Sequence, residues 1–424
     1  MINSLKNQLQ NKIGKKIQSR GDCELVANAI LETLDIEISY NTIRRLYGLA
    51  PATIPQPKTL NTIAQFLGFK NYAHFTLSKH QTGKTELSQL VYNIVHRGDQ
   101  TEIINLAKST RRSTENFTLF TVILFRELLH LNDIELLRKL LDLDELQFDK
   151  FTYSEVLYFG NSIGLLLRNY PERGKELLFK SNFIHNVYLI FVDYSNLNGY
   201  YGDWTEQINL KAPSKAIGIF TSSILEFRKF LNLKKPNFPH DKLLYSKKLN
   251  PILCSRLIAL KLMSTDTTRH QKILEKYFTI HTKKSLLMDY SHELFTSSIL
   301  TKNRDLMKFL IHQIDWHAET SFYYHKYHLN SFYLMAMFYY RLTGNNREET
   351  RFEQLFNLEN CVYSYQEFIN LLYVIFRFDQ ANSPKLKNAF QLKYMILSKK
   401  LNYPLFSEKY LVSYFQELPF QVYD

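Results

Sequence analysis

The chain has 424 residues and a formal net charge of +13, with 45% hydrophobic and 22% charged residues. This composition excludes a disordered chain, and the length exceeds what one hydrophobic core supports, so we expect at least two domains or an elongated repeat array. Only 13 Gly and 11 Pro occur, which is too few turn residues for a β-rich protein and therefore predicts an all-α fold.

The first predicted element is an amphipathic helix at residues 2–17. Five apolar residues recur there at helical spacing, and lysines occupy the remaining surface. The apolar residues are Ile2, Leu5, Leu9, Ile13 and Ile17. We expect Gly21 and Asp22 to end this helix and to cap the next one.

Two further helices are predicted directly after it. Residues 23–34 carry an apolar pattern, residues 35–38 form a connection, and a short third helix extends from Tyr40 to Tyr47. Ser39 precedes this third helix and has a side chain suited to an N-cap, while Gly48 follows it and can end it.

A fourth helix is predicted after a proline-containing loop at residues 51–57. We expect Thr59 to cap it and Gly68 to end it. The polar stretch Lys79–Lys84 is predicted to be a linker. These boundaries divide the chain into an N-terminal domain, residues 1–80, and a C-terminal domain, residues 85–424.

The C-terminal domain is predicted to be a series of helices. Clear helical periodicity occurs at residues 87–95, 134–141, 269–278, 303–314, 331–342 and 348–356. Three times an apolar helix meets an asparagine-containing break, at Asn132, Asn303 and Asn345, and a charged amphipathic helix follows. Helical hairpins that cannot bury their faces alone stack on one another, so we predict a hairpin or solenoid-like domain similar to tetratricopeptide (TPR) arrays. The consensus of a named repeat is missing.

Positive charge is concentrated at the N-terminus. Residues 1–80 hold ten basic and five acidic side chains, a net charge of +5, and the other 344 residues carry +8. A concentrated positive field attracts phosphate backbones and favours a nucleic-acid partner. The alternative is that a Lys- and Asn-rich composition reflects an AT-rich genome.

Cysteine usage and hydropathy predict a cytoplasmic protein without membrane association. Cys23, Cys254 and Cys361 are far apart and odd in number, which is typical neither of a disulfide framework nor of a zinc finger. The N-terminus is too polar for a signal peptide. The longest apolar run, residues 117–131, contains polar and charged residues and is shorter than the ~20 residues of a membrane crossing.

Two segments carry a family resemblance. Residues 39–48 read Ser-Tyr-Asn-Thr-Ile-Arg-Arg-Leu-Tyr-Gly, and residues 59–68 read Thr-Leu-Asn-Thr-Ile-Ala-Gln-Phe-Leu-Gly. With the order of helices, they make residues 1–78 resemble the Cro/repressor (Xre-like) helix-turn-helix family, most closely its variant with a segment like Thr59 to Phe75. Residues 34–38 depart from the family, because they lack its glycine and form a longer turn.

The resemblance implies a DNA-binding domain whose third helix reads bases. Ile43, Leu46 and Tyr47 lie on one side of that helix and suit burial against Leu25, Ala29 and Leu67. Residues 41, 44 and 45 are spaced i, i+3 and i+4 and should project from the other side.

Arginine pairs with guanine and asparagine with adenine in the major groove, and a helix N-terminus can hold a backbone phosphate. The predicted DNA-binding residues are Ser39, Tyr40, Asn41, Thr42, Arg44, Arg45, Lys58 and Thr59. The alternative is that the two arginines are only a solvated face of a small helical bundle.

Candidate sites in the C-terminal domain have weaker signals. His325 and His328 are spaced as zinc ligands on a helix, with His317 and Glu319 nearby. Such histidines are more often packing or surface residues, so no metal site is predicted.

Two tyrosine-rich stretches, Tyr323–Tyr327 and Phe332–Tyr340, suit either a ligand groove or, more commonly, core packing. The turn-rich segment Asp193–Trp204 is predicted to be one long loop, and long loops are often functional.

Enzyme signatures are missing: there is no glycine-rich phosphate loop and no G-x-S-x-G, and His292-Glu293 lacks the second histidine of a zinc protease. We predict neither catalytic residues nor a cofactor. The leading hypothesis is a homodimeric transcriptional regulator that binds double-stranded DNA and responds to a peptide or protein effector. The alternatives are a helical protein-interaction scaffold and an RNA-binding or phage-defence factor.

Overall fold

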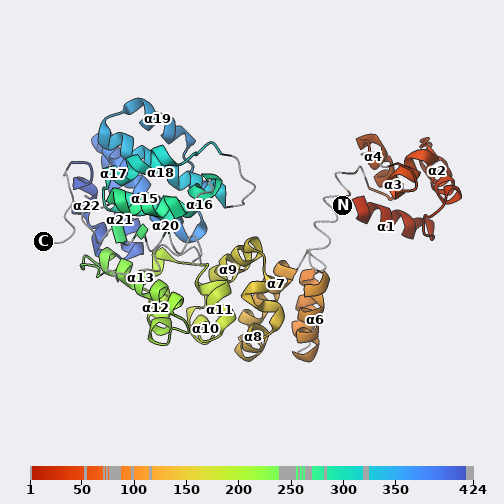
Figure 1. The fold of residues 1–424 in the computed structure, drawn as a ribbon, viewed down its shortest axis with the longest axis horizontal. Coiled ribbons are helices and arrows are strands. Elements are labelled where there is room, and N and C mark those ends of the chain that lie inside the picture. Colours follow the sequence, from red (N-terminus) through yellow and green to blue (C-terminus); the bar gives the residue numbers. More distant parts are fainter. Residues whose placement is uncertain are drawn as a thin grey trace. The chain divides into compact units, whose positions relative to one another are not determined.

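The computed structural model describes residues 2–51, 55–69, 72, 75, 87–96, 100–113, 117–237, 255, 258–259, 261–262, 270–280, 284–318 and 324–416. Every regular element within these ranges is helical, which confirms the all-α prediction (Figure 1). The chain divides into two compact units, Met1–Ile103 and Ile104–Asp424. The predicted linker Lys79–Lys84 lies outside the described residues.

The first unit contains α1 (Ile2–Ile13), α2 (Arg20–Leu34), α3 (Tyr40–Tyr47) and α4 (Pro57–Phe66), with a further helical segment at residues 87–96. We call α1–α4 the head. The four helices, drawn in red in Figure 1, share one apolar core. Its buried residues are Leu5, Leu9, Ile17, Cys23, Val26, Ile30, Ile43, Leu46, Leu60, Ile63, Ala64, Phe66 and Phe75.

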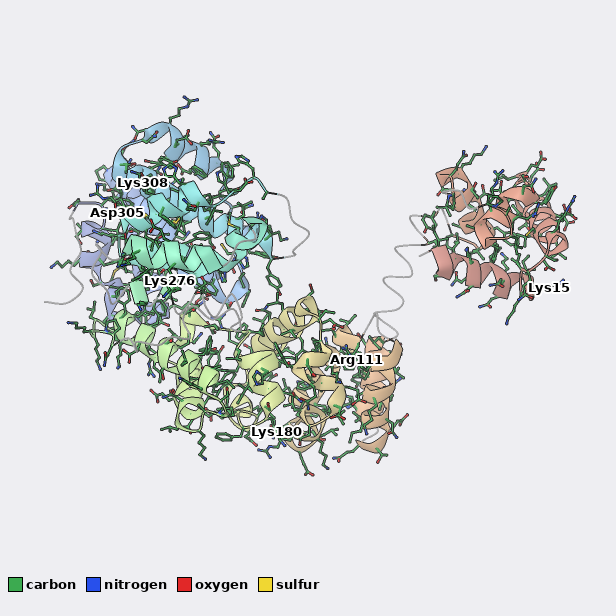
Figure 2. The ribbon with its side chains drawn as sticks, in the orientation of Figure 1. Lys15, Arg111, Lys180, Lys276, Asp305 and Lys308 are labelled. Atoms are coloured by element: carbon green, nitrogen blue, oxygen red, sulfur yellow. The ribbon has the colours of Figure 1, made fainter. Side chains whose placement is uncertain are left out.

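The first helix is shorter than predicted. It ends at Ile13, and Gly14 follows in the left-handed region with φ +75°, which glycine adopts without steric cost. Ser19, rather than Gly21 and Asp22, caps α2, and Asp22 completes a reciprocal capping box with it. The prediction at this boundary was therefore wrong. Lys15, labelled in Figure 2, lies 2.6 Å from the Asp22 carboxylate.

An aspartate stands at the left-handed end of α2. Asp35 has φ 56°, and its N–H donates to the carbonyl of Leu31, so it fills the place where a glycine is usual. Ser39 caps α3 through its side chain and Gly48 ends α3 with φ +76°, as predicted.

The start of α4 differs from the prediction. Gln56 is the N-cap and Pro57 the first helical residue, so the expectation that Thr59 caps this helix was wrong. Proline suits this position because its fixed φ is helical and its missing N–H would have no partner inside the helix.

The second unit consists of helices that follow one another from α7 to α13 and from α15 to α22 (Figure 1). The longer ones are α7 (Phe117–Leu131), α8 (Ile134–Leu141), α9 (Tyr153–Leu167), α12 (Tyr200–Leu210), α13 (Lys215–Leu231), α15 (His270–Ile280), α16 (Lys284–Leu300), α17 (Arg304–Gln313), α18 (His325–Thr343), α19 (Asn346–Leu355), α20 (Gln366–Gln380) and α21 (Pro384–Leu401). The short ones are η1 (Asp144–Leu146), η2 (Phe148–Lys150), α10 (Pro171–Lys175), α11 (Ser181–Phe183), η3 (Ile184–Tyr188), η4 (Tyr194–Asn196), η7 (Leu358–Asn360), η8 (Tyr363–Tyr365), η9 (Pro404–Phe406) and α22 (Glu408–Ser413).

The remaining helix, α6 (Gln100–Ser113), begins in the first unit and continues into the second. Its Arg111, labelled in Figure 2, pairs with Glu155 of α9 at 3.2 Å, and the guanidinium lies 4.9 Å from the ring centroid of Phe117. This part of α6 is thus attached to the second unit. Within the described ranges, no helix combines the length and apolar content of a membrane crossing.

Three hairpins, α7–α8, α16–α17 and α18–α19, share one turn. In each, a residue with positive φ is followed by an Asp or Asn that caps the next helix: Asn132–Asp133, Lys302–Asn303 and Gly344–Asn345. In each turn, the cap N–H also donates 3.0 Å to the carbonyl five residues earlier. The periodic breaks in the sequence therefore correspond to one repeated helix–turn–helix hairpin, with its cap at Asp133 rather than Asn132.

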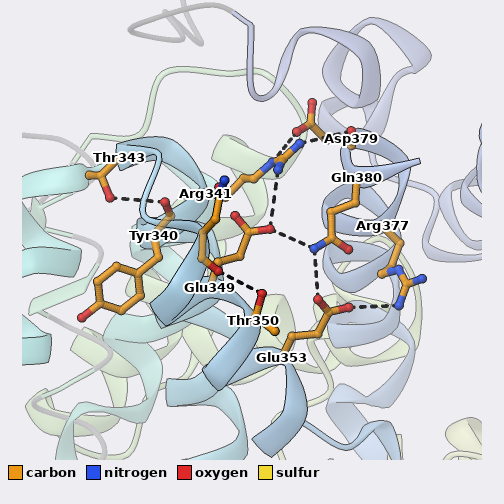
Figure 3. Close-up of polar contacts among 10 residues, drawn as sticks. Tyr340, Arg341, Thr343, Glu349, Thr350, Glu353, Arg377, Asp379 and Gln380 are labelled. Atoms are coloured by element: carbon orange, nitrogen blue, oxygen red, sulfur yellow. Dashed lines mark hydrogen bonds and ion pairs between the residues drawn. The ribbon is translucent and has the colours of Figure 1, made fainter. Parts of the chain in front are cut away.

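Polar contacts join successive hairpins. On α19, Glu349 and Glu353 both accept from the side-chain amide of Gln380, at 2.9 and 3.0 Å, while Arg341 of α18 pairs with Asp379 at 2.7 Å (Figure 3). These bonds attach the α18–α19 hairpin to the end of α20.

The predicted long loop Asp193–Trp204 is largely structural. The helix α12 already begins at Tyr200, so the interpretation as one loop was wrong. The buried Asp193 carboxylate accepts from the Tyr200 hydroxyl at 2.7 Å and from Asn196 at 2.9 Å. The Tyr403 hydroxyl accepts from the Leu197 N–H at 2.9 Å, so the C-terminal hairpins contact the middle of the unit.

Candidate nucleic-acid interface

The short helix α3 is fixed at both ends and along one side. Ser39 Oγ accepts a hydrogen bond from the N–H of Asn41 at 3.2 Å, and the N–H of Gly48 donates to the carbonyls of Arg44 and Arg45 in the last turn. Ile43 is fully buried in the head core, and Leu46 is nearly so. Helices this short are marginal alone, so this packing holds α3 in place.

The C-terminal end of α3 is attached to α1. The Tyr47 hydroxyl donates to the Lys6 carbonyl at 2.8 Å, and burial raises the pKa of this phenol. The prediction that α3 packs against Leu25 was wrong, because 49% of the Leu25 side chain is exposed. The next residue, Val26, is buried instead. The apolar pattern of α2 allows either residue to face inward, and packing selects one.

The three residues predicted to read bases from the outer side of α3, which are Asn41, Arg44 and Arg45, differ in exposure and in their contacts. Arg44 folds back on its own helix: it donates to Asn41 Oδ1 at 3.1 Å and to the carbonyl of Leu49 at 3.2 Å. The sequence predicts only the side of α3 from which Arg44 projects, and in the structure its guanidinium is engaged by these two bonds. Arg45 is exposed, and its guanidinium makes no ion pair or hydrogen bond within the described part of the chain.

The Arg44 contact orients Asn41. One lone pair of the amide oxygen is occupied, while the Nδ2 group keeps its N–H donors for another acceptor. Thr42, the next residue, is half-buried, and its backbone N–H donates to the Ser39 carbonyl. The arrangement holds one amide at a set orientation one turn before the exposed guanidinium of Arg45.

Two of the predicted residues have structural contacts. Ser39 is exposed, but its hydroxyl serves as the N-cap of α3. Tyr40 packs against the head core, and the Arg20 guanidinium lies 4.9 Å above its ring. We therefore do not expect either side chain to read bases.

The N-terminus of α4 has no side-chain cap. Gln56 contributes no side-chain cap, and Pro57 has no N–H. The following residues are Lys58, which is exposed, and Thr59, which is half-buried. A positively polarised helix end beside an exposed lysine favours a phosphate.

Two other cations of the head are already neutralised. Lys15 pairs with Asp22 at 2.6 Å, and Arg20 pairs with Glu24 at 2.8 Å. Both pairs lie near the start of α2. Arg45 and Lys58, by contrast, form no ion pair among the described residues; they lie on α3 and α4, which both pack against α2.

The histidines that the sequence offers as metal ligands in the second unit do not form a metal site among the described residues. Among the described residues, no group of three or more His, Cys, Asp or Glu side chains could hold a metal ion. His328 is buried and stacks on His292 with ring centroids 4.2 Å apart, whereas His317 stacks on Trp316. The predicted neighbour Glu319 lies outside the described residues.

The two tyrosine-rich stretches differ in role. Phe332, Met335 and Phe338 are fully buried, which confirms core packing for the second stretch. In the first stretch, Tyr324 and Tyr327 line a cavity. Sequence reasoning missed this cavity, because its walls come from segments as far apart as residues 148 and 369 and so leave no local pattern.

Comparison with known proteins adds no relative: the chain matches no family model, no curated protein and no solved structure. The resemblance of residues 1–78 to the Cro/repressor family therefore stays a prediction from the residues themselves.

Proposed function

We propose that the protein is a cytoplasmic DNA-binding transcriptional regulator, in which α2 and α3 act as a helix-turn-helix and the second unit is a TPR-like hairpin array for dimerisation and effector binding. One observation carries the proposal. The helix α3 is capped at both ends and buried on one side, and beside an oriented asparagine it exposes an arginine that has no ion pair or hydrogen bond among the described residues.

In this proposal α3 enters the major groove. Arg45 donates bidentately to guanine O6 and N7, and the Asn41 amide pairs with adenine. Lys58 and the first amides of α4 bind a backbone phosphate, which sets the register without reading sequence. Arg44 positions Asn41 and does not itself contact a base.

We propose that two copies bind two half-sites, because one recognition helix reads only a few base pairs. The dimer surface we assign is the apolar stripe of α21, where Leu392, Met395 and Ile396 are spaced i, i+3 and i+4 and are exposed by 64, 44 and 61%. Exposed aliphatic side chains on successive turns of one helix are typical of a surface covered by a partner.

The test is to select bound fragments from random duplex DNA with the full-length protein. Fluorescence anisotropy then compares a selected duplex with a scrambled one, and with an RNA duplex, over a salt series. We expect tighter binding to the selected DNA at every salt concentration. Equal binding to all duplexes would remove the regulator proposal, and preference for RNA would favour an RNA-binding factor.

The second candidate function is a helical protein-interaction scaffold. The same α21 stripe favours it, because an exposed apolar surface can also hold a different protein. A protein that stays monomeric and shows no duplex preference would support this candidate.

A further inference from the structure

The second unit contains a partly open cavity of about 300 Å³. Its walls come from α9, the segment after η3, α13, α16, α18 and the segment from Cys361 to Tyr365. This volume is at the lower end of the ~300–1,000 Å³ of small-molecule sites. The space thus suits a small ligand, not a peptide.

The lining has an apolar part and a polar part. Leu157, Ile190, Ile217, Phe220 and Ile369 contribute apolar surface from four segments. Imidazole, hydroxyl and amide groups supply the polar part, among them those of His292, His328 and Asn161. Small-molecule sites combine these two features, because apolar walls give affinity and a few polar groups give orientation.

Among the described residues that line the cavity there is no aspartate, glutamate, lysine or arginine. A ligand with a net charge would lose its hydration there and would find imidazoles, but no carboxylate, ammonium or guanidinium group, among these lining residues, and this transfer is costly. An uncharged ligand with one hydrogen-bonding end pays no such penalty.

A buried carboxylate behind the wall holds the polar part in place. Glu293 lies 3.0 Å from His292 Nε2 and accepts from the hydroxyls of Tyr194 at 3.0 Å and Tyr365 at 2.7 Å. His292 stacks in turn on His328. The imidazole of His292 is therefore oriented from α16, η4 and η8 together, as expected for a preformed site.

A second hollow adjoins the cavity beside Tyr324. This hollow of about 270 Å³ shares Asn161, Tyr324 and Tyr327 with the first, so these side chains stand between the two spaces. Asn161 Nδ2 donates to the Tyr324 hydroxyl at 3.1 Å.

We propose that this cavity binds a small uncharged molecule with a ring-sized apolar part and one hydrogen-bonding group, and that this molecule is the effector of the protein. The effector role rests on the proposed regulatory function, whereas the binding itself does not. The binding experiment therefore uses no DNA, so that it can fail or succeed independently of the DNA proposal.

The probes are benzamide and benzoate, which have nearly the same shape but differ in charge. Saturation-transfer NMR on the full-length protein should show benzamide bound and benzoate at least tenfold weaker. Ser331→Phe fills the cavity from α18 and should weaken benzamide at least tenfold. Thr350→Phe is the matched control: its hydroxyl also donates to the carbonyl four residues earlier, but it lies away from the cavity.

Ala216→Phe, on the α13 wall, replaces Ser331→Phe if circular dichroism shows that the latter does not fold. Benzoate binding as tight as benzamide would overturn the uncharged ligand class. Benzamide binding that survives both filling variants, or no benzamide binding to the wild type, would overturn the site. Benzamide binding without sequence-specific DNA binding would keep the site and remove only its effector role.

Discussion

Replacing Arg45 with alanine should remove sequence preference and leave the head folded. The guanidinium is exposed and has no partner within the described residues, so its loss should change the free energy of unfolding by less than about 0.5 kcal/mol. One bidentate base contact discriminates by about 1–3 kcal/mol, and a dimer on two half-sites loses it twice. We therefore expect the preference for a selected duplex to fall by roughly 2–6 kcal/mol, which is at least about 30-fold.

Arg44→Ala should behave in the opposite way. It removes two charge-assisted hydrogen bonds, to Asn41 and to the Leu49 carbonyl, at a half-exposed position. We expect a cost of about 1 kcal/mol in the stability of the head and a smaller loss of preference, because Asn41 loses its orientation. Thermal unfolding followed by circular dichroism measures the first effect, and anisotropy on selected and scrambled duplexes measures the second.

Two control variants make the comparison decisive. Arg45→Lys keeps the charge but lacks the planar fork, so it should lose preference while keeping non-specific affinity. Lys16→Ala removes another exposed cation of the head and should leave preference unchanged. If Arg45→Ala keeps the wild-type preference, α3 is not the base reader and the proposed docking is refuted.

Three other expectations concern the phosphate contact, the dimer and acid stability. Lys58→Ala should weaken binding to selected and scrambled duplexes alike and reduce the slope of log K against log salt by about one; a loss confined to the selected duplex would contradict this role. Light scattering should show that the wild type is a dimer and that the double variant Leu392→Glu, Ile396→Glu is a monomer. Added salt should tighten the wild-type dimer, because α21 has five lysines and no acidic residue and salt screens the repulsion between the two copies. A wild type that is monomeric with and without DNA would contradict the dimer. The hydrogen bonds from Lys15 and Ser19 hold the pKa of Asp22 well below its usual range, so Asp22 contributes stability above about pH 4 that is lost as the pH falls through its folded-state pKa. Acid titration should show this loss in the wild type and a flatter profile in Asp22→Asn, and equal profiles would refute the assignment.

Local features of the head were predictable from the sequence. The period of the apolar residues located the helices, Ser39 and Gly48 marked both ends of α3, and the burial of Ile43 and Leu46 followed from their spacing. These features depend on residues within one or two helical turns, so a single segment contains the information.

Where two local signals competed, the sequence alone did not select between them. The apolar period continues to Ile17, yet α1 ends at Ile13, and Ile17 is buried although it lies in a non-helical segment. Leu25 and Val26 both fit the inner face of α2, and only packing against α3 places Val26 inside.

Contacts between distant segments were decided by the tertiary structure. Arg44 folds back because the chain turns at Gly48 and brings the Leu49 carbonyl within reach. The cavity and its buried Glu293 gather segments more than 200 residues apart. A periodic pattern records which face of a helix is buried, but the partner that covers this face is set by the path of the whole chain.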